Sequence, residues 1–226
     1  MKPRIVALIP MRHHSERVPG KNYRTFAGKE LYHHIVEALL DCELIDELVI
    51  NTDSPRIMED ATEHFPQVRL IERPENLRAP AVPMNDVLLH NVTKVESNYY
   101  LQTHSTNPLL RTETIDRAIN LFLENHPNYD SLFSVTRIQK RLWDGQTKPI
   151  NHNPAILLRT QDLPPLYEEN SCLYIFSRST LEKRHNRIGE RPLMFEIEAD
   201  EAWDIDDEMD FRIAEFLYCE RAGARG

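Results

Sequence analysis

Short apolar runs and stretches with helical spacing alternate along the first half of the chain. The run at 5–9 is apolar throughout, as in a buried strand, whereas the apolar residues of 31–42 recur with the helical period. Similar patterns predict strands at 48–50, 68–71, 99–102 and 131–136, and helices at 55–64, 85–95 and 115–125. Thr112 or Thr114 is expected to cap the last of these helices. Because this alternation is typical of a mostly parallel sheet with helices on its faces, we expect a three-layer α/β fold.

The second half of the chain contains a segment of a different character. Residues 137–170 are polar, carry prolines and lack helical periodicity. We therefore expect them to project from the core of a single domain that spans 1–226. Strands are predicted at 172–176 and 194–197, followed by an acidic turn and a C-terminal helix.

Composition and charge narrow the classes of protein to which the chain can belong. Its 226 residues carry a formal net charge of −9, which argues against a nucleic-acid partner, because a phosphate backbone requires a clustered cationic surface. The three cysteines lie far apart and lack the spacing of zinc ligands, which favours a reducing compartment. No apolar stretch approaches the roughly 20 residues that a bilayer needs. We therefore expect a soluble, cytoplasmic protein without a membrane partner.

The polar loop at 11–29 directly follows the first predicted strand and is long for such a connection. It holds Arg12, Arg17 and Lys21, and Gly20 would let the backbone approach a ligand closely. Loops at the carboxyl ends of strands bind ligands in open α/β sheets, and guanidinium and ammonium groups together suit a polyphosphate. The nucleotide motifs G-x-x-x-x-G-K-S/T and G-x-G-x-x-G do not occur there. The alternatives are a phosphate site and a solvated basic loop, and the position after the strand favours the first.

Asp204 and Asp206 form the second candidate site. In an extended segment, residues two apart point to one face, so both carboxylates would lie opposite Ile205. Two hard oxygen ligands on one face suit Mg²⁺, which completes its shell with water and substrate phosphates. The alternative is that one of these acids, or Asp207, caps the following helix, and both roles can hold together.

The loop resembles a known signature, and the resemblance extends along the chain. Seven of its residues match the motif R-x-G-S-K-R-x-P-G-K-N of acylneuraminate cytidylyltransferases, also called CMP-sialic acid synthetases: Arg12, Ser15, Arg17, Pro19, Gly20, Lys21 and Asn22. Other segments resemble the family in the same order: 49–53, 73–75, 101–102, 110–112, 161–170, 174–176, 204–206 and 210–211. Because these matches span nearly the whole sequence, the chain resembles a divergent member of this family.

The resemblance implies a nucleotide-binding fold and a Mg²⁺-dependent enzyme. Such an enzyme transfers CMP from CTP to the anomeric hydroxyl of a sialic-acid-like nonulosonic acid and releases pyrophosphate. Lys21, Asp204 and Asp206 would be catalytic, with the two aspartates holding Mg²⁺. The implied binding residues are, for the nucleotide, Arg12, Ser15, Arg17, Lys21, Asn22 and Arg73 and, for the sugar, Gln102, Arg111, Tyr167, Glu169 and Asn170. In the family a segment like 137–170 packs on a partner subunit, so the resemblance also implies a projecting dimerisation segment and a homodimer.

The chain departs from the family's pattern at several positions. His14 replaces a glycine and Glu16 a lysine, the loop at 103–108 replaces a shorter P-T-S-P, and 79–84 lacks the D-T-x-S pattern that helps recognise cytosine. A carboxylate at position 16 would repel a triphosphate, so we expect that Arg17 takes over or that Glu16 turns outward. The alternatives are therefore a nucleotidyltransferase for an eight-carbon ulosonic acid or another sugar, and a non-catalytic sugar-nucleotide binding protein.

The histidine pairs at 13–14 and 33–34 are a further candidate for metal binding. Adjacent histidines on a helix diverge by about 100°. No third ligand has a suitable spacing in the sequence. We therefore expect no metal site at either pair.

Overall fold

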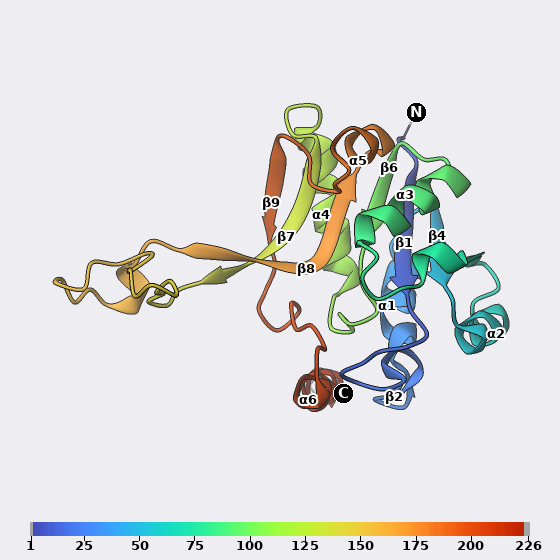
Figure 1. Ribbon diagram of the computed structural model, residues 1–226, viewed down its shortest axis with the longest axis horizontal. Coiled ribbons are helices and arrows are strands. Elements are labelled where there is room, and N and C mark those ends of the chain that lie inside the picture. Colours follow the sequence, from blue (N-terminus) through green and yellow to red (C-terminus); the bar gives the residue numbers. More distant parts are fainter. Residues whose placement is uncertain (1, 224–226) are drawn as a thin grey trace.

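A computed structural model describes residues 2–223 of the chain, and within them seven strands form one sheet (Figure 1). These strands are β1 (Ile5–Met11), β4 (Glu47–Thr52), β5 (Arg69–Glu72), β6 (Tyr99–Gln102), β7 (Ser131–Ile138), β8 (Leu166–Phe176) and β9 (Pro192–Glu196). Their order is β5-β4-β1-β6-β8-β7-β9, in which β8 runs antiparallel to both neighbours and the other neighbouring pairs are parallel. The expected α/β fold with a mostly parallel sheet is confirmed.

Helices cover both faces of the sheet and so make three layers (Figure 1). One face packs against α1 (Leu31–Leu40), α2 (Pro55–His64) and α4 (Thr112–Asn125). The other face packs against α3 (Met84–Lys94) and α5 (Arg178–Arg184). Most residues of β1 enter these two cores alternately, and the whole strand is buried. Burial on both faces explains why this strand appears in the sequence as a continuous apolar run.

The remaining elements are short or lie at the carboxyl edge of the sheet. α6 (Glu208–Gly223) packs with the hairpin of β2 (Thr25–Phe26) and β3 (Lys29–Glu30) around a small third core. Single 3₁₀ turns are η1 (Lys21–Tyr23), η2 (Glu75–Leu77) and η3 (Thr160–Asp162). None of the helices within residues 2–223 is both long enough and apolar enough to cross a bilayer.

β7 and β8 run on beyond the sheet as an arm that projects far from the rest of the molecule (Figure 1). Residues 135–138 pair with 166–169 along the arm, and a bridge between Trp143 and Pro149 lies near its tip. The segment expected to project is therefore the one that does so. Its role in dimerisation and the assignment of a single domain stay predictions.

Some local details differ from the expectations. The expected cap of α4 is wrong, because the helix already begins at Thr112 and neither threonine hydroxyl caps it. The Thr112 hydroxyl instead donates to Ala38 O at 2.9 Å and the Thr114 hydroxyl to Glu201 Oε1 at 2.9 Å. The periodicity also fails to predict α5 and the β2–β3 hairpin, since such short elements hold too few apolar positions to show a period. β8 begins at 166 rather than 172, because its first half is a polar part of the arm.

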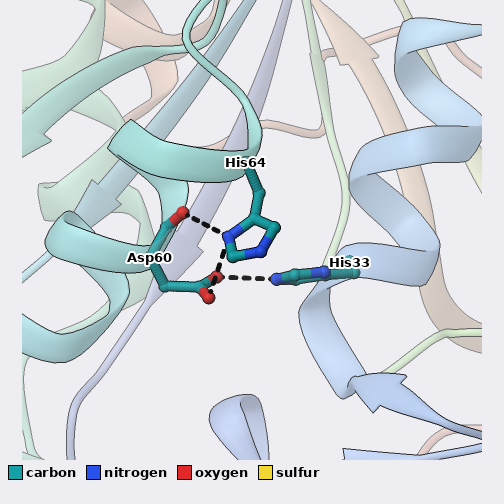
Figure 2. A group of neighbouring side chains, drawn as sticks. All are labelled: His33, Asp60 and His64. Carbon is teal, nitrogen blue, oxygen red and sulfur yellow. Dashed lines mark hydrogen bonds and ion pairs between the residues drawn. The ribbon is translucent and has the colours of Figure 1, made fainter.

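The histidine pair of α1 gives a second correction. His33 and His34 diverge as expected, since His33 Nε2 lies 2.6 Å from Asp60 Oδ2 and His34 Nε2 lies 2.9 Å from Phe26 O. The expectation that no third candidate ligand accompanies His33 is wrong, because α2 brings Asp60 and His64 beside it (Figure 2). His64 Nδ1 lies 3.2 Å from Asp60 Oδ1, so the three side chains satisfy one another. Hydrogen bonding and ion pairing therefore account for this group.

Asp60→Ala is expected to lower the free energy of unfolding by about 1–3 kcal/mol, because the buried Tyr32 hydroxyl and His33 Nε2 lose their shared partner. Burial raises the pKa of Asp60, but hydrogen bonds from Tyr32 and His33 outweigh it and hold the pKa below its ordinary value. The stabilisation is therefore present above the ordinary carboxyl pKa and is lost as pH falls through the lower folded-state value. Urea unfolding at neutral and at acid pH measures both effects.

Glu59→Ala is the matched control, since Glu59 is an exposed acid of the same helix. It should change the free energy of unfolding by less than about 0.5 kcal/mol. Equal losses in the two variants, or an Asp60→Ala loss that does not shrink in acid, would contradict the assigned role of Asp60.

Candidate active site

The loop after β1 is held by backbone geometry and by side-chain hydrogen bonds. Gly20 has a φ of 68°, and a Cβ at this position would lie 2.8 Å from a ring carbon of Tyr23, so the turn needs glycine. Asn22 Nδ2 donates to Arg12 O at 2.8 Å, and Ser105 Oγ donates to Asn22 Oδ1 at 2.7 Å. Asn22 therefore joins the loop after β1 to the loop after β6 at the carboxyl edge of the sheet.

A cavity of about 200 Å³ opens at this edge. All six side chains expected to bind the nucleotide line it: Arg12, Ser15, Arg17, Lys21, Asn22 and Arg73. His104 and Thr106, from the loop after β6, line it as well. A larger cavity of about 480 Å³ is lined by residues of α1, α4 and α6, with Arg111 among them. The smaller cavity is the better candidate, because the cationic side chains converge there.

The acidic turn before α6 lies against the loop. Lys21 Nζ donates to Ile205 O, and Arg17 Nη2 pairs with Asp206 Oδ1 at 2.6 Å. Ile205 itself is fully buried and belongs to the same small core as Val18 of the loop. Its side chain thus points into the protein, as the spacing of the two aspartates predicts. Contacts of both backbone and side chain therefore join the two ends of the chain at one site.

Burial shifts the pKa values of two charged groups at this contact. Burial lowers the pKa of Lys21, and the carboxylates of Asp204 and Asp206 offset the shift only in part. Burial raises the pKa of Asp204, and a hydrogen bond from Thr106 offsets this only in part. Asp204 Oδ1 is buried and has no hydrogen-bond partner within residues 2–223. Because a buried carboxylate oxygen without a partner is unfavourable, this position suits a bound cation.

Arg73 reaches the cavity from the end of β5. Its side chain is almost fully buried, Nε donates to Asn51 Oδ1 at 2.8 Å, and Nη2 donates to Asn51 O at 3.1 Å. Asn51 Nδ2 donates in turn to Asn91 Oδ1 at 2.7 Å. Burial lowers the pKa of Arg73 to about 10, although the charge of Asp53 opposes the shift. The guanidinium is therefore a firmly held cation at the edge of the site.

Two of the residues expected at the sugar site are linked through Tyr174 and through Arg187, a residue that the motifs do not contain. Gln102 ends β6 and is fully buried, and Arg187 Nη1 donates to its Oε1. The Arg187 guanidinium lies 3.5 Å from the ring centroid of Tyr174, whose hydroxyl donates to Glu169 Oε1. Gln102 and Glu169 therefore belong to one cluster between β6 and β8.

Within residues 2–223, no hydrogen bond joins the side chains of the other three residues expected at the sugar site to this cluster. Asn170 Oδ1 accepts a hydrogen bond from Ser134 at 2.6 Å, and Tyr167 is exposed on the arm. Arg111 pairs with the fully buried carboxylate of Glu201 at the start of α4. This pair ties α4 to the segment before the acidic turn. A sugar-binding role for these three residues stays a prediction.

Arg187 and His104 are the polar residues that the motifs miss. His104 lines the cavity, and its Nε2 lies 3.0 Å from Gln102 Nε2. Both residues lie outside the strands and helices, where no period marks them. The one signal in the sequence is the departure of 103–108 from the family's pattern, which points to His104.

Of the two loop residues that depart from the family's signature, His14 lines the cavity and Glu16 does not. Glu16 is exposed and, within the described chain, stands outside the lining of the cavity, whereas Arg17 and His14 line it. Glu16 therefore turns outward, which is one of the two expected arrangements, and a phosphate-binding role for Arg17 stays a prediction.

The loop after β1 and the acidic turn before α6 thus meet at one cavity. The sequence model of the family described as cytidylyltransferase matches residues 6–219. The chain belongs to the cytidylyltransferase family. The resemblance seen in the motifs is thereby confirmed, and it covers the loop, the sheet and the acidic turn alike.

Individual relatives agree with the family. The CMP-N,N'-diacetyllegionaminic acid synthase of Legionella pneumophila is 28% identical over 232 residues, which cover 95% of this chain and 96% of the relative. The N-acylneuraminate cytidylyltransferase A of Danio rerio is 27% identical over 93% of this chain, which spans only 50% of that relative's length. A solved CMP:2-keto-3-deoxy-manno-octonic acid synthetase complexed with CTP has a TM-score of 0.73 at 18% identity and covers 96% of this chain and 99% of its own. The last likeness shows the fold.

Proposed function

We propose that this chain transfers CMP from CTP to the anomeric hydroxyl of a sialic-acid-like nonulosonic acid and releases pyrophosphate. The observation that carries the proposal is the convergence of the six expected nucleotide-binding side chains on one cavity, which Lys21 and Arg17 join to the acidic turn. The acceptors in the names of the Legionella and zebrafish relatives support the choice of acceptor.

The cationic side chains of the cavity would bind the triphosphate and the leaving group in this reaction. The anomeric oxygen forms a bond to the α-phosphorus, the hydroxyl proton passes to solvent, and the bond to the bridging oxygen of pyrophosphate breaks. Arg12, Arg17, Lys21 and Arg73 would hold the triphosphate and neutralise the charge that grows on the leaving pyrophosphate. Gln102 would orient the sugar, and no covalent nucleophile is required.

Mg²⁺ is part of the proposal, and the acidic turn fits it. Asp204 supplies a buried oxygen without a partner, and Asp206 supplies a second carboxylate beside Lys21. When bound, the ion would neutralise phosphate charge and lower the pKa of the attacking hydroxyl. Arg17 pairs with Asp206 at 2.6 Å, so binding of a phosphate by Arg17 would release this carboxylate.

A homodimer formed through the arm is also proposed. Large exposed apolar side chains gather there, and Leu157 is 88% exposed. Leu157→Asp is expected to raise the dimer dissociation constant by about 10-fold or more, measured by sedimentation equilibrium. Met209→Asp, at an exposed apolar position of α6, is the control and should leave the constant unchanged. A wild-type chain that stays monomeric at every concentration would contradict the dimer.

The cytoplasm is the proposed compartment. Cys42, Cys172 and Cys219 are all free thiols, and the first two are buried. Free thiols fit a reducing compartment. A fractionation that recovers the protein outside the cytoplasm would contradict this location.

A pyrophosphate-release screen tests the reaction. Four nucleoside triphosphates are combined with N-acetylneuraminate, N,N'-diacetyllegionaminate and 3-deoxy-manno-octulosonate in the presence of Mg²⁺. Turnover is expected with CTP and a nonulosonic acid. Pyrophosphate release with a triphosphate other than CTP would show that the proposed base is wrong. Pyrophosphate release with the eight-carbon acid alone would show that the proposed acceptor is wrong.

A further inference from the structure

Arg187 lies in the loop after α5, and the proposed mechanism gives its charge no role. Its guanidinium donates to Gln102 Oε1 and lies 3.5 Å from the ring centroid of Tyr174. Both of these partners are fully buried, and Arg187 is itself partly buried. The arginine is therefore held in one orientation from two sides.

No carboxylate within residues 2–223 forms an ion pair with Arg187. Glu169 is the acid whose charge acts on it, but Glu169 accepts its hydrogen bond from Tyr174 instead. Burial accordingly lowers the pKa of Arg187. A guanidinium has five N–H donors, and most of them are left for another partner. A partly buried cation without a counterion is unfavourable unless an anion joins it.

The cluster of Arg187 adjoins the cavity through two contacts. Gln102 accepts from Arg187 on one side and lies 3.0 Å from His104 Nε2 on the other, and His104 lines the cavity. The charges of Arg187 and Lys21 both act on His104, and burial lowers its pKa to about 3. His104 is therefore neutral and lies within reach of the charges of both Lys21 and Arg187.

We propose that Arg187 binds the carboxylate of the acceptor and so selects a sugar acid over a neutral sugar. The inference rests on the proposed function and identifies a residue that no motif marks. In an ulosonic acid the carboxylate is attached to the anomeric carbon, next to the hydroxyl that attacks. A guanidinium is suited to hold a carboxylate through two parallel hydrogen bonds, which fixes that hydroxyl as well.

Binding of an acid and of its uncharged amide separates this role from simple support of Gln102. The CMP-loaded full chain is titrated with each of the three acids of the screen and with the matching carboxamides, and saturation-transfer NMR gives the dissociation constants. Arg187→Gln is expected to weaken binding of the acid by about 10- to 100-fold and of the carboxamide by less than about 3-fold. Arg187→Lys keeps the charge and should retain part of the preference for the acid.

Arg184→Gln is the matched control, since Arg184 is an exposed arginine at the end of α5, three residues before Arg187. It should leave both constants unchanged. Equal weakening of acid and carboxamide by Arg187→Gln would reduce Arg187 to a support of Gln102 and overturn the proposal. A wild-type chain that binds none of the acids, or binds acid and carboxamide alike, would also overturn it.

The binding measurement and the turnover assay test the two proposals separately. A wild-type chain that releases pyrophosphate but binds acid and carboxamide alike would keep the proposed function and reject the role of Arg187. If the chain binds the acid more tightly than the carboxamide, loses this preference in Arg187→Gln, and yet forms no CMP-sugar, the role of Arg187 is kept and the proposed function is rejected.

Discussion

Replacing Asp206 by Asn is expected to lower kcat for CMP transfer by at least about 10³-fold, because an amide oxygen carries no charge to hold Mg²⁺ against the phosphates. Asp206 is half-exposed, and only Arg17 pairs with its side chain within the described chain, so the substitution should leave the fold intact. Rates measured over a range of Mg²⁺ concentrations should show that the variant needs far more of the ion.

Asp207→Asn is the matched control for this loss. Asp207 Oδ1 accepts hydrogen bonds from the backbone of Met209 at 2.8 Å and of Asp210 at 2.9 Å, which caps α6. Asn caps a helix about as well as Asp, so this neighbouring variant should keep its rate. Wild-type rates in Asp206→Asn, or equal losses in the two variants, would exclude the proposed metal role.

Lys21→Met is expected to lower kcat/KM for CTP by about 10²- to 10³-fold, the range seen when one charge-stabilising donor is removed. Methionine keeps the length and apolar stem of the side chain, so what is lost is the charge in the cavity and the bond to Ile205 O. Kinetics with varied CTP and with varied acceptor should show that kcat/KM falls more for CTP than for the acceptor.

A control for Lys21 lies at the start of β3, eight residues further along the chain. Lys29 pairs with Glu37 and stands outside the lining of the cavity in the described part of the chain. Lys29→Met should therefore leave kcat/KM unchanged. If Lys21→Met lost thermal stability and acceptor affinity in the same proportion as CTP affinity, Lys21 would only join the loop to the turn and would not bind phosphate.

The elements that the sequence predicts well are those with enough buried positions to show a period. β1 and α1 are of this kind, because most of their side chains enter a core. α5 has one buried residue, Leu181, so no pattern reveals it. The arm is recognisable only as a break in the pattern, since its strands are stabilised by pairing with each other rather than by burial.

Five of the six side chains expected at the nucleotide site stand together in one loop, which is why the sequence could group them, and Arg73 joins them from the end of β5. Arg12 to Asn22 form a continuous motif, and all the expected side chains reach the same cavity. The contact of Lys21 with Ile205 could not be derived from spacing, because it joins the two ends of the chain through a shared core. The resemblance to a family grouped Lys21 with Asp204 and Asp206 but did not give this contact.

The acceptor side was harder to predict. Tyr174 lies beside Gln102 because β8 pairs with β6, and the loop after α5 brings Arg187 to both residues. No local pattern in the sequence encodes these neighbours. Arg111 shows the opposite case, since a matching motif places it with the substrate while the structure pairs it with the buried Glu201. Long-range packing decides both positions.

Phosphorus-31 NMR of the chain with CTP, Mg²⁺ and a nonulosonic acid tests the central claim most directly. We expect the three CTP signals to decay while pyrophosphate and a CMP-sugar phosphodiester appear in equal amounts. CTP that stays intact with every acid, or that yields pyrophosphate and free CMP without a phosphodiester, would contradict it.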